Sequence, residues 1–139
     1  MSELNILFDT HAWLWFVAGD IKIDPKIITL VEKSREMNSL YLSSISLWET
    51  SMLIKKERVN VNQPTLSWIK SAIKTSNIHL IHITPEIAYE STELPNNFHG
   101  DPADRIIVAT ARVMDLIILT RDHKILDYSK NKFVQTVAI

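Results

Sequence analysis

Near its N-terminus the chain reads Asn5-Ile6-Leu7-Phe8-Asp9-Thr10-His11, and this stretch decides the predicted fold. Three apolar residues, Ile6 to Phe8, are followed at once by a carboxylate. A short run that is apolar at every position is typical of a strand buried on both faces, as in a parallel sheet. Asp9 would then lie at the carboxyl end of a central strand, where open α/β sheets bind their ligands. The alternative is that Asp9 only caps the helix that follows, because Asp is a favoured N-cap residue.

The rest of the chain alternates between helical patterns and short apolar runs that are typical of strands. Helical patterns are predicted at 10–17, at 25–38, after the serines at 44 and 46, and at 65–75, 85–94 and 102–114, and further strands at 41–42, 78–83, 116–119 and 133–137. Ser44 or Ser46 is expected to cap the third helix, since serine is a preferred N-cap residue. This alternation predicts an α/β fold with a mostly parallel five-stranded sheet and helices on both faces.

Composition limits the possible functions. With 139 residues, of which 46% are hydrophobic, residues 1–139 are expected to form a single domain. A net charge of -1 excludes a globally basic nucleic-acid binder, but leaves room for a local basic patch. The absence of cysteine excludes thiolate metal sites, and two glycines are too few for a Gly-rich phosphate loop. No signal peptide or membrane-spanning run is recognised, so a cytoplasmic location is expected.

Acidic residues from distant segments are predicted to meet at one edge of the sheet. Asp9 ends the first strand, Glu49 lies early in the helix after the second strand, and Asp122 follows the fourth strand. Asp101 and Asp104 lie in the first turn of the helix before the fourth strand. Because clustered carboxylates repel one another and raise each other's pKa, such a group requires a compensating cation. Hard oxygen ligands suit Mg²⁺ or Mn²⁺, and such a site can stabilise a phosphoryl oxyanion.

Each acid also has a purely structural interpretation. Asp101, just before a proline, is well placed to cap a helix. Asp104 in the first turn could favour the helix dipole, and Asp122 could be a turn residue. Glu49 is the exception, because it lies among apolar neighbours, where a glutamate is seldom buried without a partner. Its position therefore favours a functional role. The joint placement of the acids at strand ends therefore carries the prediction of a metal site.

Four stretches together resemble the PIN-domain family, in particular its VapC-type toxins. They are Ile-Leu-Phe-Asp-Thr-His-Ala at 6–12, Ser-Ser-Ile-Ser-Leu-Trp-Glu at 43–49, Asp-Pro-Ala-Asp-Arg-Ile-Ile-Val-Ala-Thr-Ala at 101–111 and Leu-Thr-Arg-Asp at 119–122. They occur in the order found in the family and span nearly the whole chain. The resemblance implies a three-layer α/β/α sandwich and a Mg²⁺- or Mn²⁺-dependent endoribonuclease. It also implies homodimers and a cognate antitoxin protein that blocks the site.

The resemblance also implies a set of site residues. The metal ligands of the family correspond to Asp9, Glu49, Asp104 and Asp122, with Asp101 as an auxiliary ligand, and the choice between Asp101 and Asp104 stays open at this point. Hydrogen-bonding support for the acids is expected from Thr10, Ser46 and Thr120. A path for the RNA substrate is expected along basic residues that include Arg105, Arg121 and Lys124.

Aromatic residues near these motifs are given structural roles. The tryptophans at 13, 15, 48 and 68 lie at helical spacings and are expected to be core or dimer contacts rather than base-stacking platforms. His11, next to Asp9, could contact the substrate, but it is expected on a helix surface.

Two rival functions are compatible with the same fold. The first is a non-catalytic module that binds RNA or protein, which would have no reason to retain the repulsion among the acids. The second is a phosphatase or phosphoacceptor that uses Asp9 as its nucleophile. A phosphatase of that kind needs a second Asp two residues later, where this chain has His11.

Overall fold

The computed structural model describes residues 4–19 and 22–139. Their backbone forms one sheet with strand order β3-β2-β1-β4-β5, in which every pair of neighbours is parallel. The strands are β1 (Ile6–Phe8), β2 (Leu40–Ser43), β3 (His79–Ile81), β4 (Ile117–Thr120) and β5 (Gln135–Ala138). The helices are α1 (Thr10–Ala18), α2 (Pro25–Glu36), α3 (Ser44–Lys55), α4 (Thr65–Ser76), α5 (Pro85–Thr92), α6 (Pro102–Met114) and α7 (His123–Ser129). The predicted parallel α/β fold is confirmed.

The register of the three central strands brings their carboxyl ends to one level. Phe8 of β1 pairs with Leu42 of β2 on one side and with Leu119 of β4 on the other. The next residue along each strand is therefore Asp9, Ser43 or Thr120, all at the same edge. In open α/β sheets this edge, outside the carboxyl ends of the strands, is the usual place for a binding site.

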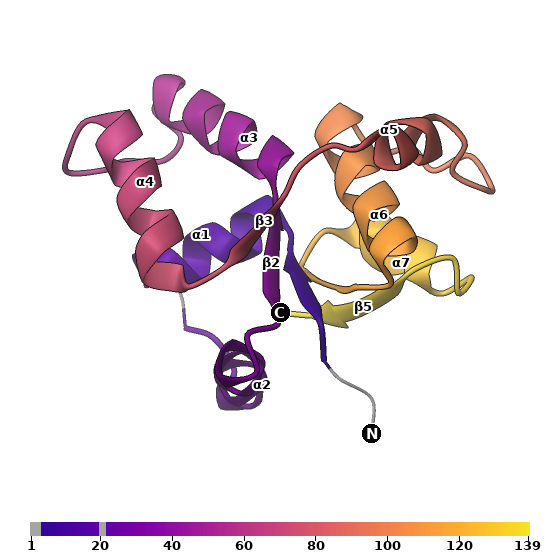
Figure 1. The fold of residues 1–139 in the computed structure, drawn as a ribbon, viewed down its shortest axis with the longest axis horizontal. Helices are drawn as coiled ribbons and strands as arrows, with labels where there is room; N and C mark the ends of the chain where they lie inside the picture. The colour runs from indigo at the N-terminus through magenta and orange to yellow at the C-terminus, as the bar shows by residue number, and fades with distance from the viewer. Residues whose placement is uncertain (1–3, 20–21) are drawn as a thin grey trace.

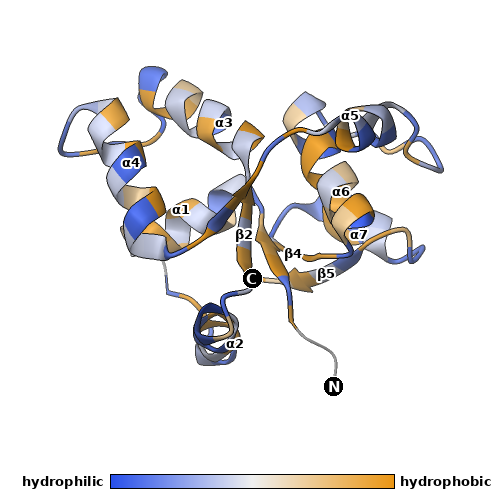
Figure 2. Ribbon diagram, in the orientation of Figure 1, coloured by the Kyte–Doolittle hydropathy of each residue, from blue (hydrophilic) through white to orange (hydrophobic). Residues whose placement is uncertain are grey.

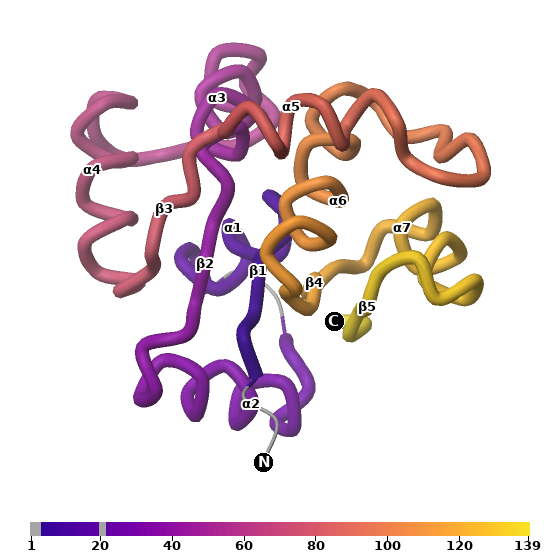
Figure 3. Tube along the Cα trace, turned by 45° about the vertical axis from the view of Figure 1, so that its right-hand side comes forward, coloured from indigo at the N-terminus to yellow at the C-terminus, as the bar shows by residue number. Residues whose placement is uncertain are grey.

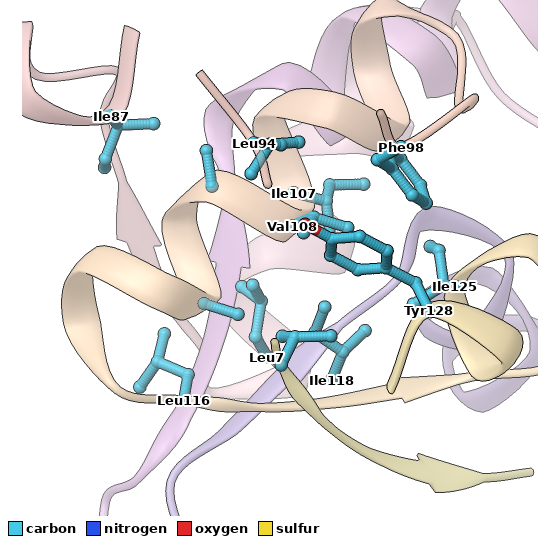
Figure 4. Packing of buried hydrophobic residues seen from close by; sticks show 13 residues of the cluster. Leu7, Ile87, Leu94, Phe98, Ile107, Val108, Leu116, Ile118, Ile125 and Tyr128 are labelled. Atoms are coloured by element: carbon cyan, nitrogen blue, oxygen red, sulfur yellow. The ribbon is translucent and has the colours of Figure 1, made fainter. Parts of the chain in front are cut away.

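Alternate side chains of the strands enter two separate hydrophobic cores. Leu7 and Ile118 face a core that includes Ile107 and Val108 of α6 and Ile125 of α7 (Figure 4). Residues of the opposite pleat face pack against α1, α2 and α4: these are Ile6, Phe8, Leu40, Leu42 and Leu119. Because successive side chains of a strand point to opposite faces, a strand buried on both sides must be apolar throughout, as β1 is.

The helices form two layers, one on each side of the sheet. Figure 1 shows α5, α6 and α7 together on one side and α1 and α4 on the other. In Figure 3, α2 lies near the amino ends of the central strands and α3 lies at their carboxyl ends. In Figure 2, β2 and β4 are mostly hydrophobic, whereas α4 and α6 mix hydrophobic and polar residues. This is the three-layer sandwich that was predicted.

The structure corrects several details of the sequence prediction. Ser43, rather than Ser44 or Ser46, caps α3, and its side chain accepts a hydrogen bond from the amide of Ile45. Helix α2 ends at Glu36 and α5 at Thr92, each two residues before the predicted end. Helix α7 was not predicted at all.

Among the described residues, no helix is both long and apolar enough to cross a bilayer.

Candidate metal centre

Asp9 is the buried anchor of the site. Its side chain is only 6% exposed, and both carboxylate oxygens accept a hydrogen bond. The Thr10 amide donates to Oδ1 at 2.8 Å, and the Thr120 hydroxyl donates to Oδ2 at 2.7 Å. Asp9 therefore caps α1, as the structural interpretation required, and is at the same time fixed by β4. Each oxygen keeps a further lone pair, so these bonds do not exhaust the acceptor capacity of the carboxylate.

Thr120 connects Asp9 to Asp122. The hydroxyl that donates to Asp9 also accepts a hydrogen bond from the Asp122 amide at 3.0 Å. The Asp122 side chain in turn accepts from the amides of Lys124 and Ile125, at 2.7 and 3.4 Å, and so caps α7. One threonine thus fixes the orientation of one carboxylate and the backbone that carries another.

Glu49 reaches the same region from α3. Ser46, one turn earlier on that helix, is fully buried and accepts a hydrogen bond from the Thr10 hydroxyl at 2.8 Å. This bond joins the start of α1 to the start of α3. The support predicted for Thr10, Ser46 and Thr120 therefore corresponds to real hydrogen bonds, and the Thr120 hydroxyl donates directly to Asp9.

Asp101 and Asp104 approach from the N-terminus of α6. Asp101 is exposed and its side chain accepts from the Asp104 amide at 2.9 Å, so it is the N-cap of α6. Asp104 is half-buried, and acids of three other segments, Asp9, Asp122 and Glu49, contribute to its raised pKa. The capping role of Asp101 favours Asp104 as the residue that completes the site.

The acids are close enough to raise one another's pKa. Burial is the largest cause that raises the pKa of Asp104, to about 7, and the remaining causes are neighbouring carboxylates. In order of size, these neighbours are Asp101, Asp9, Asp122 and Glu49. Burial likewise raises the pKa of Asp9 and of Glu49, with opposing contributions from hydrogen bonds of Thr120 and Thr10, respectively. Five acids from β1, α3, α6 and the β4–α7 junction therefore repel one another across a short space.

The donor set fits a hard divalent cation. No ion pair within residues 4–19 and 22–139 involves these five acids, so their charge is not balanced by a bonded Lys or Arg. In the same ranges, no three His, Asp or Glu side chains are close enough to form a ready-made cage. Mg²⁺ suits such an arrangement, because it keeps several waters and needs only one or two direct carboxylate ligands.

The predicted RNA-contacting cations have different environments. Arg105 donates to the carbonyls of Ser91 and Phe98, at 2.9 and 2.6 Å, and so ties the α5–α6 loop to α6. Arg121 lies over the Trp15 ring, and Lys124 is exposed in the first turn of α7. Of these three, Arg105 has an evident structural task, and contact with RNA stays a prediction for all of them.

Gly100 is a site residue that the sequence prediction missed. A Cβ atom there would lie 2.2 Å from Cε2 of Phe98 and 2.7 Å from Cβ of Asp104. The absence of a side chain therefore lets the Phe98 ring, which is part of the core, pack directly behind Asp104. The available signal was that one of the chain's two glycines immediately precedes Asp101.

Comparisons with known proteins agree with this geometry. The family model described as "PIN domain" matches residues 6–131. Ribonuclease VapC22 of Mycobacterium tuberculosis is 31% identical over 121 residues, which cover 87% of this chain and 89% of that protein. The chain belongs to the PIN-domain family.

Solved structures share the fold at lower identity. DNA-bound VapBC from Salmonella typhimurium superposes with a TM-score of 0.71 at 14% identity, covering 97% of this chain and 98% of the other. A toxin–antitoxin complex from Klebsiella pneumoniae gives a TM-score of 0.62 at 21% identity, covering 95% of each chain. At these identities the likeness establishes the α/β/α sandwich and the parallel sheet.

Proposed function

We propose that this protein is a Mg²⁺- or Mn²⁺-dependent endoribonuclease and the toxin of a toxin–antitoxin pair. The observation that carries the proposal is the clustering of the acids. Burial is the largest cause that raises the pKa of Asp104 to about 7, and the neighbouring carboxylates Asp101, Asp9, Asp122 and Glu49 raise it further. A scaffold without catalytic activity gains nothing from such repulsion. The 31% identity to a ribonuclease supports the same activity.

In the proposed site, Asp9, Glu49, Asp104 and Asp122 hold the cation and Asp101 is auxiliary. When bound, the cation supplies Lewis-acid chemistry, which stabilises negative charge that develops on phosphoryl oxygens. The chain itself contributes orientation. The Thr120 hydroxyl fixes Asp9, and the amides at the start of α7 fix Asp122. Carboxylates held in this way need little rearrangement when RNA arrives, which is how a preorganised site lowers a barrier.

The partners follow from the same proposal. The substrate is RNA, and a cognate antitoxin protein covers the site when cleavage must be prevented, in keeping with the toxin–antitoxin complex among the structures of like fold. We further propose a homodimer of single-domain chains that acts in the cytoplasm.

A cleavage assay with a matched control tests the proposal. Purified protein is incubated with a mixed RNA pool and Mg²⁺, Mn²⁺ or EDTA, beside Asp9→Asn and the control Asp115→Asn at the far end of α6. We expect metal-dependent cleavage by the wild type and the control, and none by Asp9→Asn. Cleavage that persists in EDTA or in Asp9→Asn would exclude the carboxylate-metal mechanism. Metal and RNA binding without cleavage would instead favour a non-catalytic binding module.

A further inference from the structure

A cavity of about 270 Å³ lies directly beside the acids of the candidate metal centre. Its lining consists of Asp9, His11, Trp15, Arg121 and Asp122. Two of these residues belong to the proposed metal site, so a molecule bound in the cavity would be next to the position of the reacting phosphate. The volume lies just below the range of about 300–1,000 Å³ that is usual for pockets holding drug-sized ligands, so it suits a single ring system with its substituents.

An aromatic pair on α1 forms one wall of this cavity. His11 and Trp15 are four residues apart, and their ring centroids are 6.2 Å apart. Trp13 on the same helix is fully buried and packs against Trp68, so α1 already supplies one tryptophan to the core. His11 is exposed and Trp15 is partly exposed. Trp15 therefore presents part of its ring to solvent beside the candidate metal centre, where a ligand could contact it.

Arg121 supplies a cation to the same cavity. Its guanidinium carbon lies 4.4 Å from the centroid of the Trp15 ring, a cation–π distance. Its Nε donates to the carbonyl of Ile139 at 3.0 Å, which anchors the side chain. Arg121 therefore places a fixed positive charge beside the Trp15 ring and next to an acidic site.

We propose that this cavity is a nucleotide subsite of single-stranded RNA, in which Trp15 stacks the base next to the scissile phosphate and Arg121 contacts the backbone phosphate. The His11 ring, which is tilted by 48° to the Trp15 ring, contacts the edge of the base. The inference rests on the proposed ribonuclease function. Single-stranded bases are commonly recognised by stacking on aromatic rings and guanidinium planes. The subsite would give the enzyme a preference at one nucleotide beside the cut.

The chemistry of the cavity favours RNA over a protein segment. A peptide would make the same contacts only if it carried an aromatic and an acidic side chain at a matching spacing. RNA offers a flat base and a phosphate, which match the Trp15 ring and the Arg121 cation at the same time. The phosphate can lie beside the acids only if a metal ion neutralises their negative charge. Binding in the subsite therefore depends on the candidate metal centre.

The first test separates stacking from general damage. Trp15→Leu and Arg121→Gln are compared with Tyr89→Leu, which alters a 68% exposed aromatic on α5, and with Lys33→Gln, which alters an exposed cation on α2. Short RNAs carry either a normal or an abasic nucleotide on each side of the cleaved bond. We expect kcat/KM to fall by about 10-fold in Trp15→Leu, the usual worth of one stacked base, and the loss to vanish on one abasic RNA.

The second test reads binding instead of cleavage. In a Glu49→Gln background, which leaves the cavity lining intact, short RNA with Mg²⁺ should quench tryptophan fluorescence. The part of the quench assigned to Trp15 should be missing in Glu49→Gln/Trp15→Leu and present in Glu49→Gln/Tyr89→Leu. Thermal unfolding of each variant shows whether it is folded.

The outcomes distinguish the subsite from the proposed function. Cleavage by wild type with equal rates for Trp15→Leu and Tyr89→Leu would overturn the subsite and leave the ribonuclease standing. Loss of antitoxin binding in Trp15→Leu with unchanged RNA cleavage would assign the cavity to a protein partner and overturn the inference. If no RNA is cleaved, the ribonuclease proposal fails. Trp15-dependent quenching by RNA would still support the subsite, and its absence would overturn it.

Discussion

The two halves of the acidic site are held in different ways. On the strand side, Asp9 is buried, and Thr120 bonds both its side chain and the backbone of Asp122. On the helix side, Asp104 is half-buried at the start of α6, and its position depends on how Phe98 and Gly100 pack behind it. The strand side is determined by sheet register and hydrogen bonds. The helix side is determined by loop packing and carries the largest raised pKa.

This difference suggests a division of tasks. A carboxylate fixed by several donors has a defined geometry before any cation binds. A carboxylate repelled by four others, with a pKa near 7, gains most when a cation arrives. We therefore expect the strand side to set the geometry of the site, and the helix side to couple metal binding to stability.

The largest expected effect comes from breaking the strand side at its centre. Asp9→Asn keeps a side-chain oxygen that can accept from Thr120 but removes the charge. We expect cleavage to fall by more than 100-fold, above the 10–100-fold range that is usual for residues that only support a ligand. Cleavage rates with Mn²⁺ and calorimetric Mn²⁺ binding measure the effect. A variant that retains a tenth of wild-type activity would show that Asp9 is not a direct ligand.

A smaller loss is expected when only the connection between Asp9 and Asp122 is removed. Thr120→Val deletes the hydroxyl that serves both residues while preserving the shape of the side chain. We expect metal affinity to fall by about 10–100-fold and the free energy of unfolding to fall by about 1–3 kcal/mol.

Thr110→Val is the matched control for that experiment. Thr110 is also buried, but its hydroxyl donates to the Ile106 carbonyl within α6 at 2.7 Å. Its loss should cost some stability and leave metal affinity unchanged. Equal effects of the two variants on Mn²⁺ binding would remove the special role given to Thr120.

The helix side is disturbed most directly through its glycine. In Gly100→Ala the new methyl group collides with the Phe98 ring and with Cβ of Asp104. Overpacking of this kind costs about 1–3 kcal/mol, and the shift of Asp104 should also weaken Mn²⁺ binding. Denaturant unfolding and calorimetry measure both quantities.

Gly19→Ala provides the comparison for the glycine variant. Gly19 has φ of +69° but no atom within 4 Å of an added Cβ, so alanine there is strained without a collision. We expect a loss of stability without a change in metal affinity. If Gly100→Ala binds Mn²⁺ as the wild type does, the close contact with Asp104 does not control the site.

The same difference between the two halves explains what the sequence allowed us to predict. Asp9 and Asp122 were predictable because each follows a strand that is apolar at every position, as buried strands of a parallel sheet are. The carboxyl ends of parallel strands lie at the same edge of the sheet, so these two acids were expected near each other. The fold followed from the alternation of strand and helix patterns. The capping of α6 by Asp101 was also expected from the proline that follows it, and it is confirmed.

Other features depend on how side chains pack and left little signal in the sequence. Gly100 has an ordinary loop context, and its role exists only because the Phe98 ring packs against it. Helix α7 has seven residues, too few to show a clear period, and is fixed by the cap at Asp122. Trp15 lies in a helix rich in apolar residues, so its place in a cavity rather than the core was not visible in the spacing.

The last expected effect is on neither cleavage nor metal affinity but on the pH dependence of metal-free stability. The pKa of Asp104 rises from 3.8 in the unfolded chain to about 7 in the folded protein. Between these values the folded state binds more protons than the unfolded state, so stability falls as the pH rises, and the full penalty is present above pH 7. Asp104→Asn should therefore raise the midpoint of thermal unfolding in EDTA at pH 8 and change it much less at pH 4.

A control variant and the addition of metal ions extend this pH test. Asp115→Asn, at the other end of α6, should not alter the difference between the two pH values. Mg²⁺ or Mn²⁺ should stabilise the wild type more at pH 8 than at pH 5, because at the lower pH the cation must displace a proton from Asp104. In Asp104→Asn that contrast should shrink. If Asp104→Asn is only as stable as the wild type at pH 8 without metal, repulsion at Asp104 does not destabilise the metal-free protein. The helix side would then not couple metal binding to stability.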